Sequence, residues 1–148
     1  MRAEDVLVGC GPLSSHWGLR TWRLLFGRDE IMACPYSSSE SWRLGWAIET
    51  GLISRPEIMP ADLIELHELL LRPKSRMYRL SALTSVTLRN RMVRNSIELG
   101  RPGGAVDSYG IYDRRETDSY REILRSCYPA LYREAGFPRS FWGKVLKF

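Results

Sequence analysis

Few residues of this sequence combine the type and the spacing that catalysis or metal binding requires. The histidines, His16 and His67, lie far apart, and Cys10, Cys34 and Cys127 form no CxxC pair, so the sequence predicts no zinc site and no cofactor. Cys10 and His16 could act as nucleophile and base if the fold joined them. We expect instead that the cysteines are small core residues and that the protein is not an enzyme.

A cluster of arginines is the strongest candidate for a binding site. Arg89, Arg91 and Arg94 crowd the expected tip between two strands, within residues 72–101, where Glu98 is the only acidic residue. Such a cluster can collect the phosphates of lipid head groups or of nucleic acid. The sequence lacks the alternation of aromatic and basic residues that binds single strands, so nucleic acid is the less favoured partner. Alternatively, the arginines pair internally with the acidic residues of the preceding segment, Glu57, Asp62, Glu65 and Glu68.

Tryptophans are a second kind of candidate. Trp42 and Trp46 lie one turn apart in an expected helix, and we expect them to form an exposed interface with a protein partner or with a second copy of the chain. The alternative is a small enzyme or ligand-binding protein with a pocket between the sheet and the inserted helices. That pocket would draw on His67, Tyr109 or Asp113, and it would need at least two convergent polar groups.

Length and composition place these candidates in one ordinary domain. The chain has 148 residues, of which 44% are apolar and 26% are charged, so it can form a core without disulfides or a structural metal. The 22 basic and 17 acidic residues give a mild net charge of +5. No apolar stretch is long enough to span a membrane, and no apolar leader precedes Cys10. We therefore expect a single cytoplasmic domain, 1–148.

The N-terminal part predicts antiparallel strands. Residues 6–8 form a short β-branched run, residues 19–26 alternate between two faces, and residues 31–34 are the expected return strand. Gly27 lies in the turn between the last two, where we expect a positive φ angle. The glycine-rich stretch 9–12 is expected to be a turn.

The remainder predicts two inserted helices, further strands and a final helix. Serines before Glu40 can cap a helix and Pro60 can begin another, so we expect a helical insertion near 37–72. Helical spacing of apolar residues predicts an amphipathic helix at 115–128. Between these helical parts, alternating apolar residues predict three strands, over about 83–89, 92–99 and 106–112.

This order of elements resembles a known family. The stretch 22–31 looks like the early hairpin of bacterial pleckstrin-homology-like (bPH or GRAM-type) domains, and their second half is similar to 81–88, 94–99, 109–112 and 115–128. The resemblance implies an α+β fold, an antiparallel PH-like barrel or bent sheet capped by a C-terminal amphipathic helix. The insertion near 37–72 departs from the family pattern. Because the resemblance is to binding domains, it implies a non-enzymatic interaction module that binds a protein, itself or an anionic surface.

Overall fold

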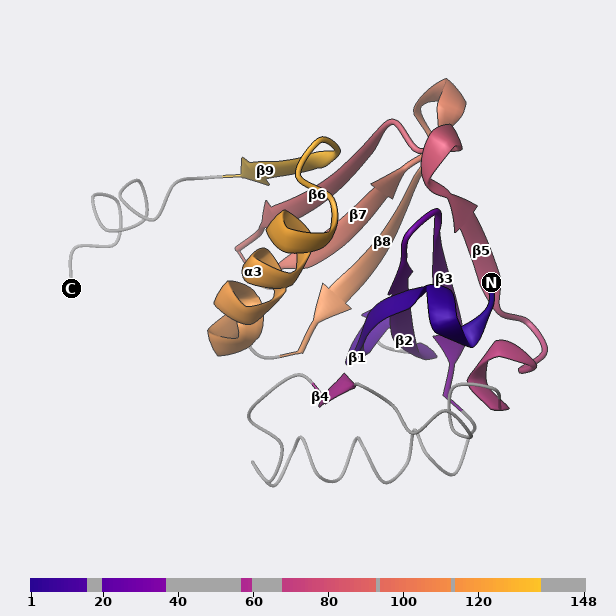
Figure 1. The fold of residues 1–148 in the computed structure, drawn as a ribbon. Helices are drawn as coiled ribbons and strands as arrows, with labels where there is room; N and C mark the ends of the chain where they lie inside the picture. Colours follow the sequence, from indigo (N-terminus) through magenta and orange to yellow (C-terminus); the bar gives the residue numbers. More distant parts are fainter. Residues whose placement is uncertain (16–19, 37–56, 60–67, 93, 113, 137–148) are drawn as a thin grey trace, which may run out of the picture.

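One bent, mostly antiparallel sheet carries the fold (Figure 1). The computed structural model describes residues 1–15, 20–36, 57–59, 68–92, 94–112 and 114–136. Within them the strand order is β5-β3-β2-β1-β8-β7-β6-β9, and β4 pairs with β1. The strands are β1 (Val6–Ser15), β2 (Arg20–Gly27), β3 (Glu30–Pro35), β4 (Glu57–Met59), β5 (Arg76–Arg79), β6 (Ser85–Asn90), β7 (Ser96–Gly100), β8 (Val106–Ile111) and β9 (Tyr132–Gly136). The α-helix α3 is Thr117–Cys127.

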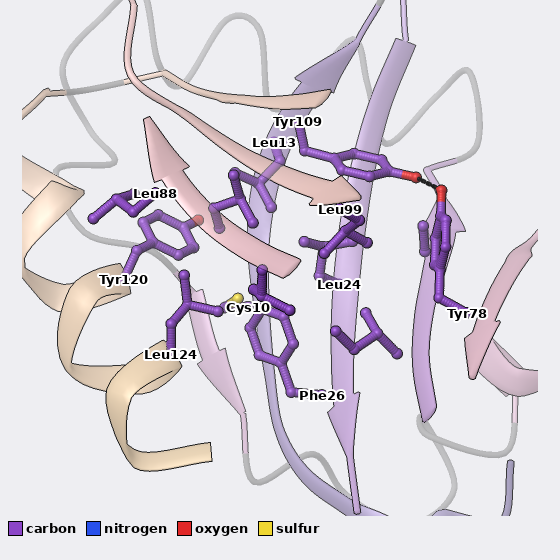
Figure 2. Close-up of a cluster of buried hydrophobic side chains, with 14 of the residues drawn as sticks. Cys10, Leu13, Leu24, Phe26, Tyr78, Leu88, Leu99, Tyr109, Tyr120 and Leu124 are labelled. Atoms are coloured by element: carbon purple, nitrogen blue, oxygen red, sulfur yellow. Dashed lines mark hydrogen bonds between the residues drawn. The ribbon is translucent and has the colours of Figure 1, made fainter. Parts of the chain in front are cut away.

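The sheet bends between β1 and β8, which pair only at Leu13–Ile111 and Ser14–Gly110. We call β1, β2, β3 and β5 the first half of the sheet, and β6, β7 and β8 the second half. Apolar side chains of both halves and of α3 form one buried cluster (Figure 2). Because β5 and β9 end the described strand order without pairing to each other, the sheet is open. The predicted α+β class, with a mostly antiparallel sheet and a C-terminal helix, is therefore confirmed.

The final helix packs on the core as its spacing predicts. Tyr120 and Leu124 are fully buried in the main apolar cluster, where Leu124 lies beside the side chain of Cys10 (Figure 2). The hydroxyl of Tyr128 donates a hydrogen bond to the carbonyl oxygen of Gly27 at 2.9 Å, which ties the end of the helix to β2. The helix begins at Thr117 rather than at residue 115, because a short 3-10 helix occupies Arg114–Glu116.

The early hairpin is confirmed, although the reason for its glycine is different. Strands β2 and β3 pair antiparallel from Trp22–Pro35 to Phe26–Ile31. The expected positive φ at Gly27 is wrong, since the described glycines with positive φ are Gly103, Gly104 and Gly136. A Cβ atom at Gly27 would lie 2.8 Å from the carbonyl oxygen of Glu30. Close approach of the backbone, not φ, therefore requires a glycine there.

The glycine-rich stretch at 9–12 is part of a strand, so the expected turn is wrong. Gly9 and Cys10 pair with Leu25 and Leu24 of β2, and the register shifts between Cys10 and Leu13. That irregularity accommodates Pro12, which has no N–H to donate to a regular ladder. Cys10 is fully buried and Cys34 is almost so, which confirms that these two thiols belong to the core.

Strand β4 corrects part of the expected helical insertion. Residues 37–56 and 60–67 lie outside the described residues, but Glu57–Met59 is a strand that pairs with Gly9–Gly11 of β1. Strand β8 pairs with β1 only further along, at Leu13 and Ser14. Backbone groups of Gly9–Gly11 therefore need another partner, and β4 supplies it.

The strands of the second half follow the prediction, with one unexpected neighbour. β6, β7 and β8 are confirmed, although β6 and β7 begin later than residues 83 and 92. Strand β9 was not expected, because its sequence lacks the β-branched residues typical of strands. It pairs in parallel with β6 from Val86–Tyr132 to Asn90–Gly136. This pairing covers backbone groups that β6 would otherwise expose at an edge.

Side chains also connect the two halves through a polar contact. The hydroxyl of Tyr78 on β5 donates to Asp107 Oδ2 at 2.7 Å and lies 2.5 Å from the hydroxyl of Tyr109 (Figure 2). Asp107 and Tyr109 both belong to β8. A buried polar contact of this kind fixes how the halves sit against each other, because an unpaired hydroxyl there would be costly.

Candidate functional site

The outer face of the second half is polar. Core residues of β6, β7 and β8 point toward the other half, so the residues between them point away from it. Those outward residues are Ser85, Thr87, Arg89, Ser96, Glu98, Gly100, Val106, Ser108 and Gly110. Most are small, which leaves room for longer side chains to lie across this face.

Two of the predicted arginines meet on this face around one carboxylate. Arg89 Nε donates to Glu98 Oε2 at 2.8 Å, and Arg91 Nη2 donates to Glu98 Oε1 at 2.6 Å. The side chain of Glu98 is 8% exposed, against 39% for Arg89 and 54% for Arg91. Burial alone raises the pKa of Glu98, but the hydrogen bonds and charges of both arginines outweigh it and hold the pKa below its usual value. This arginine–glutamate cluster therefore has a net charge of +1 at neutral pH.

Arg89 and Arg91 do pair within the chain, but with Glu98 and not with the acidic residues of the preceding segment that the sequence suggested. Glu57, Asp62 and Glu65 have side chains outside the described residues. The register pairs Arg89 with Ser96 and Thr87 with Glu98, so Arg89 and Glu98 are diagonal neighbours on one face. The alternation of β7 was the available signal, because it places Glu98 among the outward residues.

Hydrogen bonds with Asn95 and Arg114 hold the backbone at Arg91 and Met92, where the tip of the hairpin begins. The backbone N–H of Arg91 donates to Asn95 Oδ1 at 3.1 Å, and Asn95 Nδ2 donates to Thr117 Oγ1 at 2.9 Å. Arg114 Nη2 donates to the carbonyl oxygens of Arg91 and Met92. The side chain of Met92 is nevertheless 72% exposed. Met92 therefore presents an exposed apolar side chain next to the arginine–glutamate cluster, and its carbonyl oxygen and that of Arg91 accept hydrogen bonds from Arg114.

An open depression lies beside the cluster and has a volume of about 680 Å³. Its lining mixes charge with apolar surface, since Val106 is 52% exposed. The lining residues are Arg89, Asn90, Arg91, Met92, Glu98, Val106, Ser108 and Gly136. An open surface of this composition suits recognition of a charged group better than catalysis, which needs water to be excluded.

The third predicted arginine lies apart from the other two. Arg94 Nη1 donates to Ser14 Oγ at 2.7 Å, and its guanidinium lies 5.1 Å from the ring centroid of Tyr112. A Cβ atom on Gly110 would lie 2.8 Å from Arg94 Cδ, so a glycine makes room for this side chain. Arg94 is engaged with β1 and with Tyr112, where a cation–π contact holds it.

Strand β9 brings a further arginine to the same face. Arg133 pairs with Thr87 in the parallel register, and residues paired in this way share a face. Arg133 is exposed. Sequence reasoning missed it because β9 carries no strand pattern.

The other predicted site residues do not form a site in the described structure. Trp42, Trp46, His16, His67 and Asp113 lie outside the described residues. Of the alternative pocket only Tyr109 is described. It is fully buried, and burial raises its pKa, so it does not exchange protons near neutral pH. Among the residues that the structure describes, no group of three His, Cys, Asp or Glu could hold a metal ion.

Comparison with known proteins gives no indication of function, so a function must be inferred from the geometry. No protein-family model matches the chain, and no curated protein matches it. None of the described helices is both long and apolar enough to cross a membrane. The exposed tip and the arginine–glutamate cluster are therefore the features from which a function has to be argued.

Proposed function

We propose that the protein is a non-enzymatic interaction module that binds an anionic membrane surface through its β6–β7 hairpin. The proposal rests on the exposed tip, where Met92 projects beside two arginines that share one carboxylate. An apolar side chain can enter the head-group region while neighbouring cations lie at the level of the phosphates. Both kinds of contact come from one hairpin with a braced backbone.

The charge of this surface supports an electrostatic preference. Three arginines lie on this surface: Arg89 on β6, Arg91 just after it and Arg133 on β9. The one acidic residue among the described outward positions of these strands is Glu98, which pairs with Arg89 and Arg91. Each basic residue near an anionic bilayer contributes about 1 kcal/mol. We place the binding at the cytoplasmic leaflet, because that leaflet carries the anionic lipids and because Cys10 and Cys34 are free thiols.

Other partners fit this surface less well. Among the described residues, no aromatic side chain lines the depression beside the cluster, whereas single-stranded nucleic acid is bound by stacking of its bases on aromatic rings. An enzyme would need convergent polar groups in an enclosed pocket, and the depression is open. Self-association through Trp42 and Trp46 remains a separate hypothesis that depends on residues outside those described.

We also propose that the fold is a variant of the PH-like domains. Support comes from the antiparallel hairpin β2–β3, the hairpin β6–β7, and the helix α3 that follows β8 and packs on the core between the halves. Strands β4 and β9 are additions to that plan. The membrane proposal does not depend on this assignment, because it rests on the hairpin itself.

Vesicle co-sedimentation tests the membrane proposal. Wild type should bind phosphatidylglycerol vesicles better than neutral phosphatidylcholine vesicles, and the preference should weaken with salt. The double variant Arg89→Ser/Arg91→Ser should bind the anionic vesicles roughly thirtyfold less, from about 1 kcal/mol for each arginine. The matched control is Arg28→Ser/Arg79→Ser, which removes two exposed arginines from the first half and should lose much less.

Two further results decide the proposal. Met92→Ser should weaken binding to both kinds of vesicle, because it removes apolar contact and leaves the charge unchanged. Equal binding of wild type to neutral and anionic vesicles, or to neither, would remove the membrane proposal. Equal losses in the two double variants would show that overall charge, not this hairpin, attracts the protein to the bilayer.

A further inference from the structure

Glu98 occupies the position that an anionic ligand of the arginine pair would take. Both of its carboxylate oxygens are used, one by Arg89 at 2.8 Å and one by Arg91 at 2.6 Å. The carboxylate is nearly buried, whereas both arginines are about half exposed. A carboxylate held in this way stays charged, because its pKa lies below the usual value.

Binding of an external anion is therefore opposed by a resident one. Each guanidinium has several N–H donors and gives one to Glu98, so donors remain for a phosphate group at the edge of the depression. The phosphate, however, meets a cluster whose charge Glu98 has already reduced. If the phosphate took the two donors that Glu98 uses, a buried carboxylate would be left unpaired, which is costly.

We propose that Glu98 is an internal counter-ion that holds this surface at low affinity for anionic head groups. The inference rests on the proposed membrane function and concerns the regulation of the same site. Two effects of removing the charge oppose each other. Loss of Glu98 frees both arginines to move, which lowers affinity, and it raises the charge of the cluster from +1 to +2, which increases affinity. The charge effect prevails. Both arginine side chains are already about half exposed while they pair with Glu98, so their conformational freedom increases little when Glu98 is removed.

The test compares charge-removing variants on phosphatidylglycerol vesicles. Glu98→Gln should bind about fivefold more tightly than wild type, the equivalent of one unit of charge near an anionic surface. Glu98→Ser should give a similar gain, which shows that the new amide is not responsible. Glu98→Asp keeps the charge and should stay close to wild type. The matched control Asp118→Asn neutralises a 71% exposed carboxylate on α3 and should gain much less.

A combined variant separates this inference from the proposed function. In the Arg89→Ser/Arg91→Ser background, Glu98→Gln should give no gain, because the charges that Glu98 offsets are absent. If the arginine variant loses binding while Glu98→Gln and Glu98→Ser are unchanged or weaker, the hairpin binds membranes but Glu98 is not a competitor. If the arginine variant binds like wild type, the proposed function fails first.

Discussion

The two halves of the sheet differ in what lies over their outer faces. In the first half Leu25 and Met32 point outward and pack with Leu69 in a second apolar cluster. In the second half Glu98 takes an outward position, and the side chain of Arg89 reaches across to it. The same alternation along the strands therefore gives a covered apolar face in one half and a charged face in the other.

This difference shows which part of the surface is available for binding. An apolar outer face is stable only when another part of the chain removes it from water, and Leu69 helps to do so for the first half. A polar outer face can stay in contact with water, as in many antiparallel sheets. In the second half Thr87, Ser96 and Glu98 are buried, whereas Arg89 and Arg91 keep 39% and 54% of their side chains exposed. These two arginines can therefore meet a partner without a change in fold.

The largest expected effect contrasts matched positions on the two outer faces. Leu25→Ala removes a fully buried side chain from β2 and should lower the free energy of unfolding by about 2–5 kcal/mol. Val106→Ala removes a half-exposed side chain from β8 and should change it by about 0.5 kcal/mol or less. Urea denaturation of both variants measures the difference. Equal costs would mean that the outer face of the second half is also covered.

A smaller effect concerns the polar contact between the halves. Tyr78→Phe removes the hydroxyl that bonds Asp107 and Tyr109, and it should lower the free energy of unfolding by about 1–3 kcal/mol. The control is Tyr132→Phe, whose hydroxyl bonds Glu134 on the exposed surface. Burial and the neighbouring charge of Glu134 raise the pKa of Tyr132 to about 12, but water can replace that bond.

The expected order of these two tyrosine variants is the informative result. In thermal melts, the melting temperature of Tyr78→Phe should lie well below that of wild type, and the melting temperature of Tyr132→Phe should lie close to it. A melt of Tyr78→Phe that matches wild type would show that apolar packing alone holds the halves together. In that case the contact with Asp107 would contribute little to stability.

The smallest effect is the pH dependence that Glu98 contributes. Its pKa is lowered in the folded protein, so its pairing stabilises the fold above the usual carboxyl pKa and is lost as the pH falls through the folded value. Glu98→Gln removes that contribution, which we expect to be about 1 kcal/mol or less for partly exposed partners. The melting temperature of wild type should therefore fall more than that of Glu98→Gln between about pH 5 and pH 3. If the melting temperatures of the two proteins fell in parallel with pH, the predicted contribution of Glu98 would be contradicted.

The sequence by itself determined the elements that show a local pattern of apolar residues. Alternation predicted the hairpin β2–β3 and the strand β8, and helical spacing predicted α3 with Tyr120 and Leu124 in the core. Burial of Cys10 and Cys34 also followed from their type and surroundings. The strands and the helix depend on which side chains repeat at a fixed spacing, and that spacing is visible in one sequence.

Only the tertiary structure decided the contacts that depend on what other segments leave unpaired. Strands β4 and β9 pair with backbone groups of β1 and β6 that the other neighbours of those strands do not use. The short sequences of β4 and β9 do not by themselves predict strands. The three arginines of the hairpin have the same type and similar spacing, yet Glu98 gathers Arg89 and Arg91 while Ser14 and Tyr112 take Arg94. Charge is a property of the sequence, but the partner of each charge is set by register and by the bend of the sheet.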